Sequence, residues 1–378
     1  MRIFFAGGGT GGHLYPGLAI ARALVALEPS ARPLFIGARR GVERDLLPRT
    51  EFEHLLLDLH PLYRTRPWNN WRTAAGLSSA WRLLGRAARA DPPEAVVGTG
   101  GYASGAALAW AVGHHVPLTL QEQNSHPGLT TRIFSRFAQE IYLGYDEART
   151  MLRPGSGAWV GETGNPIEAP PVPRPDRALA RERWGFPASG GTVLLVVGGS
   201  QGARALNDVV ADWIRRGLPE GAYVIWGTGT RLYERYAGLE SERTRVIPYI
   251  SPIQEAYAAS DVALTRAGAL TLAELCAWAV PPIMIPLPTA AADHQTSNAR
   301  ALASAGAGVH VTQAELTVDR LSAVVAELVH SPERLKIMAE AALSRARPDA
   351  ANAIARRLVE LSRLRQQRHN SEHASHLR

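Results

Sequence analysis

The sequence is poor in cysteine and lysine, and it lacks the patterns of a membrane-spanning or metal-dependent protein. Its single cysteine, Cys276, excludes a disulfide framework and a cysteine-based zinc site and favours a reducing compartment. No apolar run approaches the ~20 residues of a spanning helix, and the first residues read as a strand instead of a signal peptide. No Asp-x-Asp pair is present to hold a metal on a diphosphate. We therefore expect no metal and no other cofactor.

The composition instead indicates two domains and acidic partners. The chain has 378 residues, of which 46% are hydrophobic, enough for two cores of ordinary size. The net charge is +7, and arginine supplies every basic residue except Lys336. This charge favours nucleotide phosphates, anionic lipid headgroups or nucleic acid as partners. Nucleic acid ranks lowest, because the arginines are spread over many predicted helices.

A glycine-rich turn follows the first predicted strand. Residues 2–6 are apolar, residues 7–12 read Gly-Gly-Gly-Thr-Gly-Gly, and residues 14–27 have helical periodicity with Pro16 in the first turn. Such a turn lets a ligand approach backbone N–H groups closely. It lacks the Lys-Ser/Thr ending of a P-loop and the spacing of a dinucleotide fingerprint. His13 stands at the helix start, where it is either a general base or a structural member of the turn.

Two more polar loops follow strands of the same half. One runs through residues 99–105 and contains Tyr102, and the other runs through residues 121–128 and contains Glu122 and Asn124. Alternating strands and helices predict a parallel sheet, which binds ligands at the carboxyl ends of its strands. We therefore expect these loops to build one ligand site. The strands predicted for this half are residues 2–6, 32–37, 53–59, 95–98, 116–120 and 140–144.

A segment rich in tryptophan and arginine interrupts the alternation between residues 60 and 90. Trp71, Trp81 and Leu84 fall on one face of a predicted helix, and arginines flank that face. This pattern is typical of a basic amphipathic surface that lies on a membrane. The alternative is that the tryptophan face belongs to the core. In the membrane interpretation, Trp110 on a later helix extends the same patch.

The second half restarts with the same pattern. Residues 192–197 form a buried strand, and residues 198–202 read Gly-Gly-Ser-Gln-Gly, with Ser200 placed to bond a phosphate oxygen. A strand over residues 246–250 ends at Ile250, whose backbone can read the edge of a base. Further strands are predicted over residues 223–226, 261–264 and 309–311.

The most informative stretch of the second half follows residues 261–264. Gly268 allows a tight turn, and a helix from Thr271 aims its first N–H groups at a diphosphate. Glu274, one turn into this helix, can accept two hydrogen bonds from a ribose diol. Side chains suited to sugar hydroxyls follow at Asp293, Gln295 and Asn298.

The predicted fold class is α/β, with two Rossmann-like doubly wound parallel-sheet domains that face a cleft. The N-terminal domain is expected over residues 1–163 and 346–365, and the C-terminal domain over residues 164–345. Residues 366–378 are polar and expected to be disordered. One class of sugar-nucleotide transferases has this architecture, but topology alone does not give function.

Seven motifs carry a resemblance to a known family. They lie at residues 7–13, 98–102, 122–124, 164–166, 198–203, 266–271 and 293–295. In this order they resemble the MurG family within glycosyltransferase family 28, over residues 1–365. The resemblance implies a GT-B fold and an inverting transfer of N-acetylglucosamine from UDP-GlcNAc to the C4 hydroxyl of lipid I, a lipid-linked N-acetylmuramyl-pentapeptide. It also implies an anionic membrane surface as a partner, at the cytoplasmic face of the bacterial membrane.

The resemblance assigns roles to individual residues as well. The acceptor diphosphate and the reaction centre would be met by Thr10, Gly11, Gly12 and His13, and the acceptor side would be lined by Tyr102 and Asn124. The UDP diphosphate would be held by Ser200, Ala269, Leu270 and Thr271. Uracil would meet Ile250, and the ribose would meet Glu274. The N-acetylglucosamine hydroxyls would meet Gln295 and Asn298.

Two positions depart from the family pattern. Glu168 stands where the family usually has an arginine near the nucleotide phosphates, so we expect Glu168 to point away or Arg266 to compensate. Gln121 replaces the usual histidine before Glu-Gln-Asn. Neither departure decides whether His13 or Glu122 is the base. The alternative function is that of a related GT-B transferase which glycosylates a lipid such as diacylglycerol.

Overall fold

The computed structural model describes residues 1–59, 70–199 and 202–376, which form two compact units. The first unit combines Met1–Ile167 with the C-terminal segment that begins at Asp349, and the second unit is Glu168–Pro348. Each unit contains one parallel sheet with helices on both faces, so the predicted doubly wound α/β class is confirmed. The expected boundaries after residues 163 and 345 lie slightly before these divisions.

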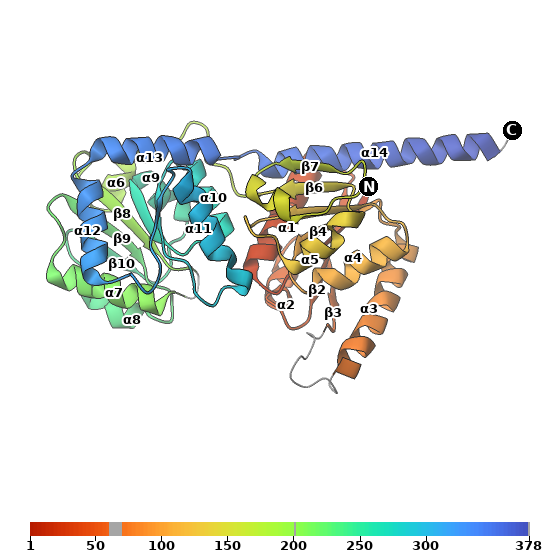
Figure 1. Ribbon diagram of the computed structural model, residues 1–378, viewed down its shortest axis with the longest axis horizontal. Helices are drawn as coiled ribbons and strands as arrows, with labels where there is room; N and C mark the ends of the chain where they lie inside the picture. Colours follow the sequence, from red (N-terminus) through yellow and green to blue (C-terminus); the bar gives the residue numbers. More distant parts are fainter. Residues whose placement is uncertain (60–69, 200–201, 377–378) are drawn as a thin grey trace. The chain divides into compact units, whose positions relative to one another are not determined.

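The sheet of the first unit has the strand order β3-β2-β1-β4-β5-β6-β7 (Figure 1). Its strands are β1 (Arg2–Gly7), β2 (Arg32–Ala38), β3 (Glu53–Leu57), β4 (Ala95–Gly100), β5 (Leu118–Glu122), β6 (Glu140–Leu143) and β7 (Trp159–Glu162). Phe5 of β1 pairs with Phe35 of β2 and with Val97 of β4. Because helices cover both faces, the central strands are apolar on both sides.

Helices of the first unit form two layers. They are α1 (Gly11–Leu27), α2 (Glu43–Leu46), α3 (Asn70–Ala90), α4 (Ser104–Gly113), α5 (Leu129–Phe134) and α14 (Ala350–His376). One layer consists of α1 and α14, which pack against each other and share a core with Ile3 and Phe5. The other layer contains α3 and α4.

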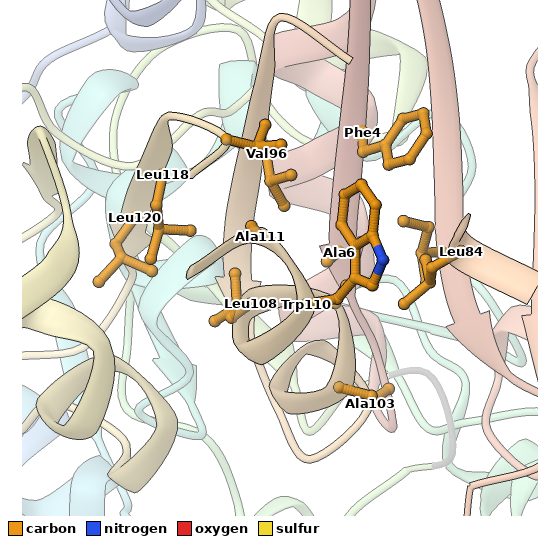
Figure 2. Packing of buried hydrophobic residues seen from close by; sticks show 14 of the residues in the cluster. Phe4, Ala6, Leu84, Val96, Ala103, Leu108, Trp110, Ala111, Leu118 and Leu120 are labelled. Carbon is orange, nitrogen blue, oxygen red and sulfur yellow. The ribbon is translucent and has the colours of Figure 1, made fainter. Parts of the chain in front are cut away.

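Trp110 of α4 belongs to the core and not to a surface patch. Figure 2 shows its indole beside Phe4 and Leu84, and the ring centroids of Phe4 and Trp110 are 6.2 Å apart. Trp110 is 2% exposed. The prediction that it extends an exposed membrane patch is therefore wrong, because α4 packs directly on the sheet.

The sheet of the second unit has the strand order β10-β9-β8-β11-β12-β13. Its strands are β8 (Thr192–Val197), β9 (Ala222–Gly227), β10 (Thr244–Ile247), β11 (Val262–Thr265), β12 (Pro282–Met284) and β13 (Val309–His310). One face is covered by α7 (Arg204–Arg216), α12 (Val318–Val329) and α13 (Pro332–Arg345). The other is covered by α6 (Arg177–Arg183), α9 (Ile253–Ala259) and α10 (Ala269–Ala277). The remaining helices are α8 (Tyr233–Tyr236) and α11 (His294–Ser304).

Each sheet has one place where the strand order reverses. It lies between β1 and β4 in the first unit and between β8 and β11 in the second. Open parallel sheets bind ligands at the carboxyl ends of the strands beside this point. The turns at residues 8–10, 101–103 and 266–268 follow β1, β4 and β11, and Gly198 and Gly199 follow β8.

Two strands were not predicted from the sequence, and the last helix ends later than expected. β7 is an edge strand of four residues, and β12 has three residues beginning with Pro282. Proline suggests a loop in so short a stretch, although it is compatible with the first residue of a strand. α14 continues to His376, whereas we expected disorder from residue 366. Arginine, glutamine and leucine favour helix, and neither glycine nor proline interrupts this segment.

Candidate active site

The turn after β1 leads directly into α1. Gly9 has a φ of 91°, a conformation that favours glycine. Thr10 is the N-cap residue, but within the described part of the chain its side chain makes no capping hydrogen bond. The His13 N–H donates to the Thr10 carbonyl at 3.2 Å, so the N–H groups of Gly11 and Gly12 are the ones directed at an anion. Thr10 and Gly12 are exposed and Gly11 is half-buried, so a ligand can reach this turn.

A buried carboxylate supports the same turn. Glu43 is 0% exposed, and its Oε1 accepts hydrogen bonds from the Gly9 N–H at 2.9 Å and the Ala38 N–H at 3.2 Å. A Cβ on Gly8 or Gly41 would overlap this carboxylate, at 1.7 and 1.9 Å. The glycines thus make room for Glu43 as well as for a ligand. Glu43 is not predicted from the sequence, because a lone glutamate in a short helix carries no distinguishing pattern.

His13, in the first turn of α1, is enclosed by the loops after β4 and β5. Its Nδ1 lies 3.1 Å from Oε1 of Gln123. Thr99 Oγ1 donates to the His13 carbonyl at 2.6 Å. A Cβ on Gly100 would lie 2.9 Å from Nδ1, and one on Gly101 would lie 3.0 Å from Cδ2. Both glycines have left-handed φ values, 93° and 78°, so the backbone itself borders the imidazole.

Glu122 shapes the loop after β5. The side chain is 2% exposed. Its Oε1 accepts hydrogen bonds from the Asn124 N–H at 3.1 Å and from Asn124 Nδ2 at 3.2 Å, and its Oε2 accepts one from the Gly128 N–H at 3.1 Å. Both carboxylate oxygens are therefore engaged by the loop. Asn124 is half-buried.

Two tyrosine rings flank the glycine-rich turn. Tyr102 is 45% exposed, and a Cβ on Gly9 would lie 3.1 Å from its ring. Tyr15 is 52% exposed, and a Cβ on Gly11 would lie 3.0 Å from its ring. Partial burial raises the pKa of Tyr102. The sequence predicts Tyr102 as a site residue but not Tyr15, because Tyr15 fits the apolar periodicity of α1.

In the second unit, α10 begins at the carboxyl end of β11. Gly268 is the N-cap residue and has no side chain, so it leaves the first-turn N–H groups to a ligand. Ala269 is buried, whereas Leu270 and Thr271 are half-buried. The three predicted diphosphate residues therefore form the first turn of this helix.

Arg266 and Asn298 hold the segment that precedes α10. The Arg266 guanidinium donates to the carbonyls of Ile285 at 3.1 Å and Pro286 at 3.3 Å. Burial lowers its pKa. Asn298 is 0% exposed, and its Nδ2 donates to the Ala267 carbonyl at 3.2 Å. This position differs from the expected sugar contact, because a fully buried amide has no surface to offer a ligand.

Glu274 of α10 is bonded to a buried tyrosine. Tyr257 Oη donates to Glu274 Oε2 at 2.7 Å. Burial raises the pKa of Glu274, the hydrogen bond from Tyr257 lowers it, and the charge of Glu168 raises it. Glu168 is exposed, and its Oε2 accepts a hydrogen bond from Gln254 Nε2 at 3.0 Å. Glu274 itself is half-buried, so a ligand can approach the carboxylate.

A strained turn precedes α11. Ala292 and Asp293 have left-handed φ values of 51° and 52°, a conformation that costs a residue with a side chain roughly 1–2 kcal/mol. Asp293 Oδ1 accepts a hydrogen bond from Thr296 Oγ1 at 2.6 Å. Gln295 Oε1 accepts one from the Leu287 N–H at 2.9 Å, which orients its amide. Such strain is common at ligand sites.

Ile250 and Ser200 are the two remaining residues that the sequence predicts for the UDP site. Ile250 is 6% exposed and its side chain packs against Gly227, and β10 ends at Ile247, three residues before the predicted strand end. Ser200 lies outside the described residues. In residues 1–59, 70–199 and 202–376, no three or more histidine, cysteine, aspartate or glutamate side chains are grouped to hold a metal ion.

Exposed apolar and basic side chains occur on two helices that pack against α4. On α3, Leu77 is 47% and Trp81 is 41% exposed, whereas Leu84 is buried. Part of the predicted tryptophan face is therefore exposed and part belongs to the core. The structure does not describe the side chain of Trp71. On and just after α5 the exposed apolar residues are Leu129, Ile133 and Phe137. Exposed arginines accompany both groups: Arg82, Arg86, Arg132 and Arg136.

The chain is similar to known glycosyltransferases over nearly its whole length. The models of the glycosyltransferase family 28 N-terminal and C-terminal domains match residues 3–143 and 193–354. The chain is 41% identical to the UDP-N-acetylglucosamine-N-acetylmuramyl-(pentapeptide) pyrophosphoryl-undecaprenol N-acetylglucosamine transferase of Salinibacter ruber, over 95% of this chain and 96% of the relative. It is 40% identical to the protein of the same name from Prosthecochloris aestuarii, over 97% and 100% of the two chains.

Solved structures give the same picture of the fold. The crystal structure of MurG from Acinetobacter baumannii is similar with a TM-score of 0.75 and 26% identity, over 95% of this chain and 99% of the other. UGT2 of Phytolacca americana, complexed with UDP-2fluoro-glucose and pterostilbene, is similar with a TM-score of 0.68 over 96% and 98% of the chains. At 17% identity, the second likeness concerns the fold alone.

Proposed function

The chain belongs to glycosyltransferase family 28, and from that premise we propose that it transfers N-acetylglucosamine from UDP-GlcNAc to the C4 hydroxyl of lipid I, forming lipid II in peptidoglycan synthesis. The observation that carries this proposal is the match to relatives named for that activity over nearly the whole length of both chains. The loops beside the two strand-order reversals supply the groups that such a transfer needs.

The second unit holds the donor in this proposal. The uncapped first turn of α10 binds the diphosphate through backbone N–H groups and the positive end of the helix. Glu274 accepts hydrogen bonds from the ribose hydroxyls, and the Gln295 amide donates to a hydroxyl of N-acetylglucosamine. The backbone at Ile250 meets uracil. Asn298 acts indirectly, by holding the Ala267 carbonyl.

The first unit holds the acceptor and the base. The uncapped first turn of α1 binds the acceptor diphosphate, and Tyr102 and Asn124 line the acceptor side. His13 Nε2 takes the proton of the C4 hydroxyl as that oxygen bonds to the anomeric carbon, from the face opposite UDP. The bond to UDP breaks, and UDP leaves with the electron pair. N–H groups of α10 stabilise the charge that develops on the leaving diphosphate.

We prefer His13 to Glu122 as the base. A base needs a lone pair that is directed at the proton it removes. Both oxygens of Glu122 already accept hydrogen bonds from Asn124 and Gly128, and the side chain is 2% exposed. Glu122 therefore has a loop-shaping role in the proposal, and Asn124 is the residue it positions.

We place the protein on an anionic membrane surface, at the cytoplasmic face of the bacterial membrane. Exposed Trp81 and Leu77 on α3, and the apolar side chains on and after α5, are flanked by arginines. Arginine is attracted to anionic headgroups, and an indole suits the interface between water and lipid. Each helix among the described residues is too short or too polar to span a bilayer. The membrane contact in this proposal is therefore peripheral.

A transfer assay with labelled UDP-GlcNAc tests the proposed function. A short-chain lipid I analogue and diacylglycerol are offered separately, and UDP-GlcNAc binding is measured in parallel by calorimetry. We expect label only in the lipid I product. Label in diacylglycerol, or binding of UDP-GlcNAc without transfer to the lipid I analogue, would contradict the proposal.

A further inference from the structure

A chain of buried amides reaches His13 from the segment that follows β7. Gln121, Gln123 and Asn165 are 0%, 2% and 3% exposed. Asn165 Nδ2 donates to the Gln123 carbonyl at 3.0 Å, and Gln121 Nε2 donates to Asn165 Oδ1 at 3.3 Å. Gln123 Nε2 donates in turn to Gln121 Oε1 at 2.5 Å. Buried polar groups that are this well connected rigidify one another.

The surroundings of the Gln123 amide allow it one orientation. Its nitrogen faces three acceptors: the Thr99 carbonyl at 2.8 Å, the Gln121 carbonyl at 3.2 Å and Gln121 Oε1. An amide nitrogen only donates, so this end of the group must be the nitrogen. The Gln123 oxygen must then face His13 Nδ1, which lies 3.1 Å away. Reversing the amide would set an oxygen against three acceptors.

This orientation determines which nitrogen of His13 carries the proton. The Gln123 oxygen only accepts, so His13 Nδ1 must donate and therefore bears hydrogen. A neutral imidazole has one N–H, so Nε2 keeps its lone pair. We propose that Gln123 is a positioning residue that fixes the reactive tautomer of His13, an inference that rests on the proposed function for the identity of the acceptor.

The positioning role leaves the proton balance simple. Nε2 accepts the proton of the acceptor C4 hydroxyl as the new glycosidic bond forms and UDP leaves with the electron pair of the broken bond. The resulting imidazolium still donates from Nδ1 to the Gln123 oxygen, which favours its positive charge. Gln123 is an amide and cannot take the proton further, so His13 returns it to water after the transfer.

Replacing Gln123 with methionine tests this inference, and the same change at Gln121 is the matched control. Methionine fills a similar volume without an acceptor for Nδ1. Gln121→Met also removes a buried amide, two positions away, but leaves the Thr99 and Gln121 carbonyls to orient Gln123. We expect Gln123→Met to lower kcat roughly tenfold or more, with the KM for UDP-GlcNAc unchanged. Gln121→Met should stay within a few-fold of the natural enzyme.

Nitrogen NMR of the full-length, 15N-histidine-labelled protein reads the tautomer without any turnover. The chain has 12 histidines, and the His13 signals are identified by their loss in His13→Ala. We expect the Nδ1–H form in the natural enzyme and in Gln121→Met, and an admixture of the Nε2–H form in Gln123→Met. An Nε2–H form in the natural enzyme would overturn the inference even if Gln123→Met did not fold. Equal losses of kcat in the two variants would also overturn it. Absence of transfer by the natural enzyme would instead count against the proposed function.

Discussion

The two units have related turns at the same place in their sheets, but the turns differ in glycine content and in the burial of the polar side chains around them. The turn after β1 is rich in glycine, and the polar groups that support it, such as Glu43 and Gln123, are at most 2% exposed. The turn after β11 has one glycine, Gly268, and the fully buried Asn298 holds its backbone, whereas Glu274 and Gln295 around it are half-buried. The side chains that support the first turn are therefore buried, and the second turn also has polar side chains that a ligand can reach.

In the proposed function, this difference separates the chemical step, in the first unit, from recognition of the donor, in the second unit. Rigid support around His13 leaves one edge of one imidazole for reaction, which suits a base that must be held accurately. Several half-buried side chains in the second unit suit a ligand with many hydroxyls. We therefore expect changes in the first unit to lower turnover and changes in the second unit to lower donor affinity.

The largest expected effect is that of His13→Ala. Turnover should fall by roughly two to four orders of magnitude, the usual contribution of a general base. UDP-GlcNAc affinity should not change, because the proposed donor residues belong to the second unit. Steady-state kinetics and calorimetry on the same preparation separate the two quantities. Normal turnover in His13→Ala, together with a large loss in Glu122→Ala, would transfer the role of base to Glu122.

Gly101→Ala should displace the turn that borders His13. Its new Cβ would lie 2.0 Å from the Gly8 carbonyl, and the φ of 78° is unfavourable for alanine. A displacement of the turn of about 1 Å costs turnover on the order of a hundredfold. Gly105→Ala is the matched control, because its Cβ would meet nothing within 4 Å and alanine favours the helix. Equal kcat in the two variants would show that the turn has no fixed geometry to lose.

Glu274→Ala tests recognition in the second unit. A hydrogen-bonded contact between a carboxylate and a diol contributes about 1.5–3 kcal/mol, so UDP affinity should fall about tenfold to a hundredfold. Gln295→Ala is the comparison, since it should lower the affinity for UDP-GlcNAc but not for UDP. Calorimetry with both ligands measures this. Unchanged UDP affinity in Glu274→Ala would remove the ribose assignment.

A smaller pair of effects concerns pH. The raised pKa of Glu274 means that its charge, and with it part of the UDP affinity, is present above that pKa and is lost as the pH falls through it. Glu168→Gln removes a charge that raises this pKa, so the loss of affinity should move to lower pH. Tyr257→Phe removes a hydrogen bond that lowers the pKa, so the loss should move to higher pH. Shifts in the same direction would contradict this account of the site.

The smallest expected effect concerns the membrane surface. Replacing Leu77 and Trp81 with serine should reduce sedimentation with anionic vesicles, while activity on a short-chain soluble acceptor persists. Ile337→Ser is the control, because Ile337 is 57% exposed on α13 of the second unit. Unfolding of the Leu77/Trp81 variant would assign both residues to the core, and unchanged sedimentation would exclude them from the membrane contact.

Sequence patterns predicted this fold better than they predicted the contacts of the site. Alternating apolar strands and helices fix a doubly wound class, and glycine-rich turns mark the ends of its strands. No pattern predicts that Glu43 lies under the Gly9 N–H or that Gln123 faces His13, because these contacts join residues 34 and 110 positions apart. The contact of Asn298 is a further example. Its type suits a sugar, but only packing decides that its amide is buried against Ala267.

The linkage in the reaction product tests the central claim most directly. The natural enzyme is incubated with UDP-GlcNAc and a lipid I analogue, and the purified product is examined by proton NMR. UDP-GlcNAc is α-linked, so in-line attack by a hydroxyl whose proton passes to His13 predicts a β-linked N-acetylglucosamine on the C4 oxygen. An α-linked product, or attachment at another oxygen of the muramyl sugar, would contradict the proposed geometry of attack.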